Sequence, residues 1–231
     1  MYGRGKKAAP TLDKLLIDIG ADSREEAEKL VRPGDVAVFD SVFTKLEGGL
    51  FKAKALDDRA GCALLLELAG RTPRYDMVLA FTVQEEVGLR GAGAVAYAVQ
   101  PDIAVVVDAT TAADTAGVTS DKQVCRIGGG PVVSFMDKRT LYDKALYDRI
   151  RGLADQRKIP NQTKTVIAGG NDAGAIQTQC AGVRVAAVSL PCRYIHSASC
   201  VLHKKDVAAT RELLQVLADA LPAAEERDTA V

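Results

Sequence analysis

The sequence predicts an α/β fold, a three-layer sandwich in which helices cover both faces of a mixed, largely parallel β-sheet. Three apolar runs have the length of strands, and they span residues 77–83, 103–107 and 183–190. Helical patterns lie before, between or after these runs, over residues 59–69, about 91–99 and 206–221. Because strands that alternate with helices form βαβ units, this order favours a sheet with helices packed on it.

Two further helices are predicted in the second half of the chain. One covers residues 140–158 and has an apolar face formed by Leu141, Ala145, Ile150 and Leu153. The other is a short helix over about residues 173–180, directly after a glycine-rich loop. Both are candidates for the layers that cover the sheet.

The first 53 residues carry weaker signals. Ser23, followed three positions later by Glu26, is a capping-box pattern for a helix that ends near Leu30. Pro33 and Gly34 predict a turn, and residues 36–43 alternate in the manner of a half-buried strand. The pattern of this region is therefore mixed, with a short helix, a turn and a strand predicted.

Composition excludes several classes of partner. The 231 residues include 30 basic and 30 acidic side chains, so the net charge is zero and nucleic-acid binding has no electrostatic support. No apolar run reaches the roughly 18 residues of a membrane span, and no signal peptide opens the sequence. The five cysteines form no CxxC pair, which fits a reducing compartment. A cytoplasmic protein without nucleic-acid or membrane partners is expected.

Acidic residues stand where the predicted strands run out. Glu85 and Glu86 come two positions after one strand, Asp108 directly follows another, and His196 follows the third. Asp57 directly precedes a helix together with Asp58 and Arg59. In an open α/β sheet, ligands bind outside the carboxyl ends of the strands, and carboxylates with imidazole are ligands for zinc. The pattern predicts a metal site, and hence a metallohydrolase.

Structural explanations remain open for each of these residues. Asp57 or Asp58 is a candidate helix N-cap, and the two glutamates would suit a solvated surface. Asp108 has the character of a turn residue, and His196 that of a loop histidine with a backbone partner.

Five segments, in this order, resemble the M42 metallo-aminopeptidases, which include glutamyl and tetrahedral aminopeptidases. They are KALDDRAG (54–61), FTVQEEVGLRGA (81–92), VVVDAT (105–110), GGNDAGAIQ (169–177) and RYIHS (193–197). The resemblance covers about residues 12–210 and implies a zinc-peptidase-like sandwich. It also implies a peptide substrate, two divalent metal ions, with zinc or cobalt favoured, and assembly into a homo-oligomer.

The resemblance implies a role for each acidic residue and for His196. Asp57 would bridge two ions, and Glu85 would be the general base. Glu86 would be a terminal ligand of one ion, Asp108 a terminal ligand of the other, and His196 would complete the shell shared with Glu86.

Four further residues take supporting roles by resemblance. Asp58 and Arg59 would orient the bridging carboxylate, since outer partners fix metal ligands. Gly169 and Gly170 would let the backbone approach the substrate, because glycine permits such close approach.

The chain departs from the family at its N-terminal side. It lacks the family's His-x-Asp motif, because its two histidines are His196 and His203. Residues 1–53 are interpreted as a tail and a remnant of an inserted β-rich domain, and residues 54–231 as the metallopeptidase catalytic domain. Two ions are expected, or only one because the N-terminal histidine ligand is missing, and an edge or a face of the sheet is expected to be exposed.

Three functions follow. The first is a metallo-aminopeptidase, a hydrolase in which metal-bound water attacks the first peptide bond while Glu85 takes the proton. The second is a truncated, catalytically impaired paralogue, a metal-binding or assembly protein. The third, a cellulase-like glycosidase, would need only a pair of carboxylates. The combination of carboxylates with an imidazole favours a metal.

Overall fold

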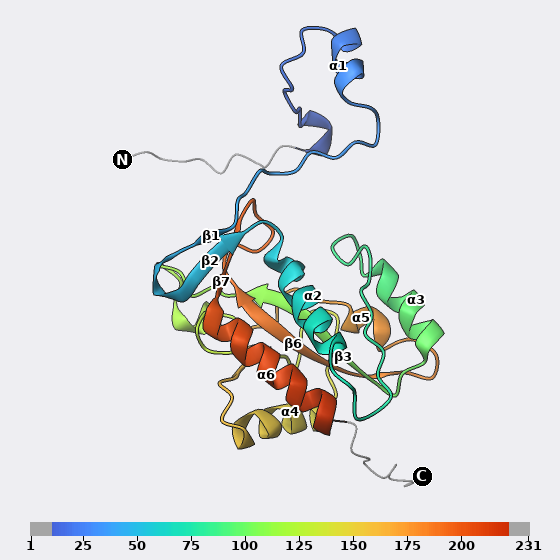
Figure 1. Ribbon diagram of the computed structural model, residues 1–231, viewed down its shortest axis with the longest axis vertical. Helices are drawn as coiled ribbons and strands as arrows, with labels where there is room; N and C mark the ends of the chain where they lie inside the picture. Colours follow the sequence, from blue (N-terminus) through green and yellow to red (C-terminus); the bar gives the residue numbers. More distant parts are fainter. Residues whose placement is uncertain (1–10, 222–231) are drawn as a thin grey trace. The chain divides into compact units, whose positions relative to one another are not determined.

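The computed structural model describes residues 11–221 and separates into two compact units between Phe39 and Asp40 (Figure 1). Within this range no helix has both the length and the apolar character needed to cross a membrane. The predicted domain boundary between residues 53 and 54 was drawn from the resemblance to a family and not from compactness, and it stays a prediction.

The first unit contains a 3-10 turn, η1 (Leu12–Lys14), and one short helix, α1 (Arg24–Leu30). The N-cap is confirmed, because the Glu26 backbone N–H donates to Ser23 Oγ at 3.1 Å. The returning bond of a capping box is shifted by one residue, since Glu26 Oε2 accepts the Asp22 N–H, at 3.0 Å, and not that of Ser23. The predicted turn at residues 33–34 also forms. The strand predicted over residues 36–43 is wrong, because this part of the described chain offers it no strand to pair with, and Val36 is 83% exposed.

The second unit is built on a four-stranded mixed sheet in the order β3 (Ile103–Thr111), β6 (Arg184–Cys192), β4 (Val132–Val133) and β5 (Gln162–Thr163). β3 and β6 run parallel, and their register extends from Ile103 opposite Arg184 to Thr111 opposite Cys192. β4 is antiparallel to β6 and parallel to β5. The predicted α/β class with a mixed sheet is confirmed.

A smaller antiparallel sheet pairs the first two strands of the second unit with a strand that lies just before its last helix. It has the order β1 (Thr44–Lys45), β2 (Leu50–Ala53) and β7 (Cys200–His203). The 3-10 turn η2 (Glu47–Gly49) connects its first two strands. Because β7 follows β6 after a short loop and β2 precedes helix α2 (Leu56–Ala69), this sheet brings two predicted site segments together.

Helices form the outer layers (Figure 1). One face of the sheet packs against α2, α4 (Lys144–Gln156) and α6 (Lys204–Ala220), and the other packs against α5 (Ala173–Ile176). Helix α3 (Arg90–Val99) contacts α5. Side chains of β6 alternate accordingly: Val188 and Leu190 pack toward the first layer, and Val185 and Ala187 toward α5.

Helix α4 begins later than predicted, after Asp143, whose side chain caps it by accepting the Leu146 N–H at 2.9 Å. Leu141 therefore lies outside the helix and is 70% exposed. Of the predicted face, Ile150 is buried and Leu153 packs against the core, whereas Ala145 is exposed, and Leu146 and Ala154 complete the buried face. Helix α5 ends at Ile176, earlier than expected.

The strand predicted over residues 77–83 is wrong, although its neighbours along the chain are correct. Residues 77–82 make no backbone hydrogen bond to any other described residue, and Val78 is 63% exposed. β3 pairs with β6 along one edge, and no described strand pairs with its other edge. An apolar run becomes a strand only when a partner takes its N–H and C=O groups, and none of the described strands does.

The core between α4, α6 and β6 gives a test of packing. Leu213 is fully buried there, whereas Leu66 on α2 is 64% exposed. We expect Leu213→Ala to lower the free energy of unfolding by about 2–5 kcal/mol, because it leaves a cavity. Leu66→Ala is the matched control and should change it by less than about 0.5 kcal/mol. Urea denaturation of both variants measures the difference, and equal losses would contradict this packing.

Candidate metal centre

Three predicted ligands converge from distant parts of the chain. His196 Nε2 lies 3.2 Å from Asp57 Oδ2 and 3.2 Å from Glu86 Oε2. Among residues 11–221, these three form the one group of His, Cys, Asp or Glu side chains whose ligand atoms all lie within 4.8 Å of one another. Ligand atoms around a tetrahedral zinc ion lie roughly 3.4 Å apart, so the set fits one divalent cation.

Asp57 projects from the irregular start of α2. Asp57 and Asp58 have non-helical backbone angles and are joined by a cis peptide bond. The Gly61 N–H donates to Asp58 Oδ1 at 3.0 Å, so Asp58 is the residue that caps the regular helix. The Asp57 carboxylate is therefore not needed as a cap and faces Glu86 and His196.

Glu85 and Glu86 lie in a tight turn that opens α3. The Glu85 carbonyl accepts the Gly88 and Leu89 N–H groups at 3.0 and 2.9 Å. A Cβ on Gly91 would stand 2.6 Å from the Val83 carbonyl oxygen, so only glycine lets the helix begin this close to the incoming chain.

Asp108 lies inside β3 rather than after its end, because the strand continues to Thr111 and pairs Asp108 with Ser189. Its carboxyl group lies close enough to that of Asp57 for each to shift the pKa of the other. Burial, with Asp58 and Asp57 nearby, raises the pKa of Asp108 well above its ordinary value. Asp108 thus interacts with the bridging candidate, and no third ligand among residues 11–221 joins this pair.

The carboxyl groups of the site are half-buried and crowded. Burial, followed by the repulsion of Glu86, raises the pKa of Asp57 to about 6. Burial raises the pKa of Asp58 to about 8, and burial with Glu86 and Asp172 raises that of Glu85 to about 7. Each shift records chiefly the cost of burying a negative charge, to which the repulsion of neighbouring carboxylates adds, and a bound cation would offset both.

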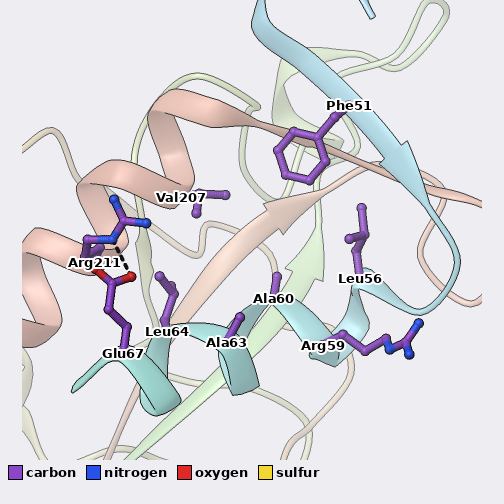
Figure 2. A pocket seen from close by; sticks show the side chains of 9 residues that line it. All are labelled: Phe51, Leu56, Arg59, Ala60, Ala63, Leu64, Glu67, Val207 and Arg211. Carbon is purple, nitrogen blue, oxygen red and sulfur yellow. Dashed lines mark hydrogen bonds and ion pairs between the residues drawn. The ribbon is translucent and has the colours of Figure 1, made fainter. Parts of the chain in front are cut away.

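Arg59 lies apart from this cluster. It lines an apolar groove of about 250 Å³ between β2, α2 and α6, shown in Figure 2. Its side chain is exposed and makes no hydrogen bond or ion pair with Asp57 or Asp58 in the described part of the chain. Its proposed role in orienting Asp57 therefore gains no geometric support and stays a prediction.

The loop before α5 contains the two glycines predicted to approach a substrate. A Cβ on Gly170 would lie 3.1 Å from both Cγ and Cδ of Arg139, so this glycine makes room for an arginine side chain. Gly169 adopts a φ of +63°, which favours glycine. Their contact with substrate stays a prediction.

Two residues near Glu85 carried no assigned role in the sequence. Thr82 Oγ1 donates to Asp172 Oδ2 at 2.6 Å, which ties the segment before Glu85 to the start of α5. Asp172 lies close enough to Glu85 to raise its pKa. Both residues lie in motifs quoted above, Thr82 in residues 81–92 and Asp172 in residues 169–177, but their hydrogen bond could be found only from the tertiary structure.

Comparisons with known proteins identify the family of this chain. A family model described as M42 glutamyl aminopeptidase matches residues 1–213. A putative aminopeptidase of Acetivibrio thermocellus is 41% identical over 190 residues, 80% of this chain and 56% of the relative. The aminopeptidase APDkam598 of the archaeon Desulfurococcus kamchatkensis has 34% identity and a TM-score of 0.88, with 93% of this chain and 62% of that chain covered.

A third similar protein is the TET1 peptidase of Pyrococcus horikoshii, described as able to assemble into a tetrahedron or a large octahedral shell. It has 35% identity and a TM-score of 0.78, with 94% of this chain and 64% of that chain covered. This chain spans between 56% and 61% of the length of the curated relatives that it matches. The predicted family and its fold are confirmed.

The raised pKa values predict how the stability of the metal-free protein depends on pH. Asp57, Asp58 and Glu85 hold protons in the folded state up to about pH 6, 8 and 7, whereas the unfolded chain releases them near pH 4. Their contribution is full below about pH 4 and is lost as the pH rises through the folded values. We therefore expect the free energy of unfolding, measured in urea with a chelator, to fall from about pH 5 to pH 8.

Asp58→Asn should flatten this decline because it removes the group whose pKa is raised furthest among the three. Asp121→Asn, at the surface, is the control and should leave the slope unchanged. A stability that rises over the same interval would contradict the assignment.

Proposed function

The chain belongs to the M42 family of peptidases, and we propose that it is a metal-dependent aminopeptidase that removes N-terminal residues from peptides. The observation that carries the proposal is the convergence of Asp57, Glu86 and His196, with Glu85 beside them. The imidazole in this set favours a metal centre over a pair of glycosidase carboxylates.

Asp57, Glu86 and His196 would hold one ion, with zinc or cobalt favoured by the mixed oxygen and nitrogen donors. Asp57 and Asp108 would supply two ligands for a second ion. A bound divalent cation would lower the pKa of a coordinated water and polarise the carbonyl group of the peptide bond.

Glu85 is suited to act as the general base. Its carboxylate is separate from the three-residue ligand cluster, yet the charges of Glu86, Asp57 and His196 all act on it. Burial raises the pKa of this carboxyl group to about 7 in the metal-free protein, which makes it a stronger base than an exposed glutamate and suits it to accept a proton from the attacking water and return it to the leaving amine. Asp172, held by Thr82, helps to set that pKa.

The structure around the start of α2 holds the carboxylate of Asp57, the proposed bridging ligand, in position. Asp58 binds the Gly61 N–H and fixes the helix start, and the carboxyl group of Asp108 interacts with that of Asp57 from β3. With these two restraints Asp57 needs little reorganisation to accept a cation, because preorganised ligands lower the cost of binding.

A second candidate function is a metal-binding or assembly protein without catalysis. The observation that favours it is the pair of Asp57 and Asp108, which no third ligand joins among residues 11–221. We also propose assembly into a homo-oligomer, from the likeness to the Pyrococcus horikoshii peptidase. Light scattering during gel filtration tests the oligomer.

The aminopeptidase proposal is tested by hydrolysis of aminoacyl chromogenic substrates with added Zn²⁺ or Co²⁺ and with a chelator. We expect Glu85→Gln to lower kcat by about 10²–10⁴-fold while the bound metal is retained, because it removes the base but no ligand. Glu67→Gln is the matched control, since Glu67 pairs with Arg211 at the groove and contacts none of the proposed ligands.

The outcomes separate the two candidates. Metal-dependent turnover that Glu85→Gln abolishes and Glu67→Gln preserves supports the aminopeptidase. Bound metal without turnover on any substrate supports the non-catalytic protein, and turnover that survives the chelator would exclude both assignments of the site.

A further inference from the structure

His196 occupies a backbone conformation that needs external support. Its φ is +57°, and Tyr194 in the same loop also has a φ of +57°. Non-glycine residues rarely adopt this left-handed region, and each costs of order 1 kcal/mol unless surrounding contacts over-determine it. The loop of residues 193–199, between β6 and β7, must therefore be anchored if His196 is to stay beside Asp57 and Glu86.

Arg193 anchors the base of this loop twice. Its backbone exchanges two hydrogen bonds with Val201, each 3.0 Å long, which close the loop. Its guanidinium binds Asp114 through two contacts, Nε to Oδ1 at 2.7 Å and an Nη nitrogen to Oδ2 at 3.0 Å. This planar, two-point geometry fixes the arginine side chain in orientation as well as in position.

Asp114 is itself held in place by a backbone group. Its Oδ2 also accepts the Ile127 N–H at 3.0 Å, and the nearby Ala112 N–H donates to the Cys192 carbonyl at 2.8 Å. The Asp114 side chain is 10% exposed. Burial acts to raise its pKa, but the bonds from Arg193 and Ile127 outweigh burial and keep it below the ordinary value.

From this geometry we infer that the Asp114–Arg193 ion pair is the positioning element that holds His196 in the metal centre. The pair touches neither the cluster nor a substrate, and it acts through the three-residue link from Arg193 to His196. Two other ion pairs of the second unit, Arg71–Asp219 and Arg211–Glu67, instead join half-exposed side chains through single contacts. The inference rests on the proposed role of His196 as a ligand.

Breaking the pair should weaken metal binding without removing a ligand. Partners that orient a metal-binding histidine typically account for about 10–100-fold in affinity. We therefore expect Asp114→Asn to weaken Zn²⁺ or Co²⁺ binding by about 10-fold. Arg193→Lys should have a smaller effect, because lysine keeps the charge but loses the two-point geometry.

The experiment measures the metal Kd of the full chain by competition with a chromophoric chelator, with the Co²⁺ absorption spectrum as a report on geometry. Glu67→Gln, which breaks the Arg211 pair, is the control and should leave the Kd unchanged. The decisive comparison is made in the His196→Ala background. There Asp114→Asn should have no further effect, because its action passes through His196.

A second readout needs no metal. Hydrogen exchange of the amides of residues 194–199 in the chelated protein should become faster in Asp114→Asn and Arg193→Lys, with the thermal midpoint reporting whether each variant folds. If Asp114→Asn weakens metal binding equally with and without His196, or if loop exchange is unchanged in both variants, the inference is overturned. If the unaltered protein binds no metal, the proposed function fails, and the exchange experiment alone decides the anchor.

Discussion

The parallel pairing of β3 with β6 is the constraint on which the rest of the second unit depends. Because the register runs without interruption to Thr111 opposite Cys192, it fixes Asp108 within β3, opposite Ser189, and it sets where β6 ends and the His196 loop begins. Helix α2 packs on both strands and carries Asp57 to the same edge. Two strands and one helix thus set the position of three of the five residues that the site brings together.

The chemistry of the site follows from the burial of several carboxyl groups close together rather than from any single residue. Asp57, Asp58, Glu85 and Asp108 all have raised pKa values, and burial is the first cause in each case. A half-buried group of acids costs stability unless a cation or protons neutralise it. The same arrangement that disfavours the metal-free state therefore creates affinity for a divalent ion and a carboxylate with a pKa suited to proton transfer.

The contacts that hold the metal-site segments in place do not involve the three proposed ligands themselves, and each of them includes a backbone N–H group. Asp58 binds the N–H of Gly61, and Asp114 binds the N–H of Ile127 while it holds Arg193. A carboxylate that binds the backbone fixes a loop as well as a side chain. Such contacts explain how His196 persists at a φ of +57° in a loop between two strands.

The sequence by itself determined the family, the α/β class, the helices α2, α3 and α6, and the residues Asp57, Glu86 and His196 as candidate ligands. Local pattern and residue chemistry carry that information. Only the tertiary structure decided that residues 77–83 form no strand, that β3 extends past Asp108, and that Asp114 and Thr82 support the site. The physical reason is that a strand exists only through its partner, and a hydrogen bond between Asp114 and Arg193, 79 positions apart, leaves no periodic trace in the sequence.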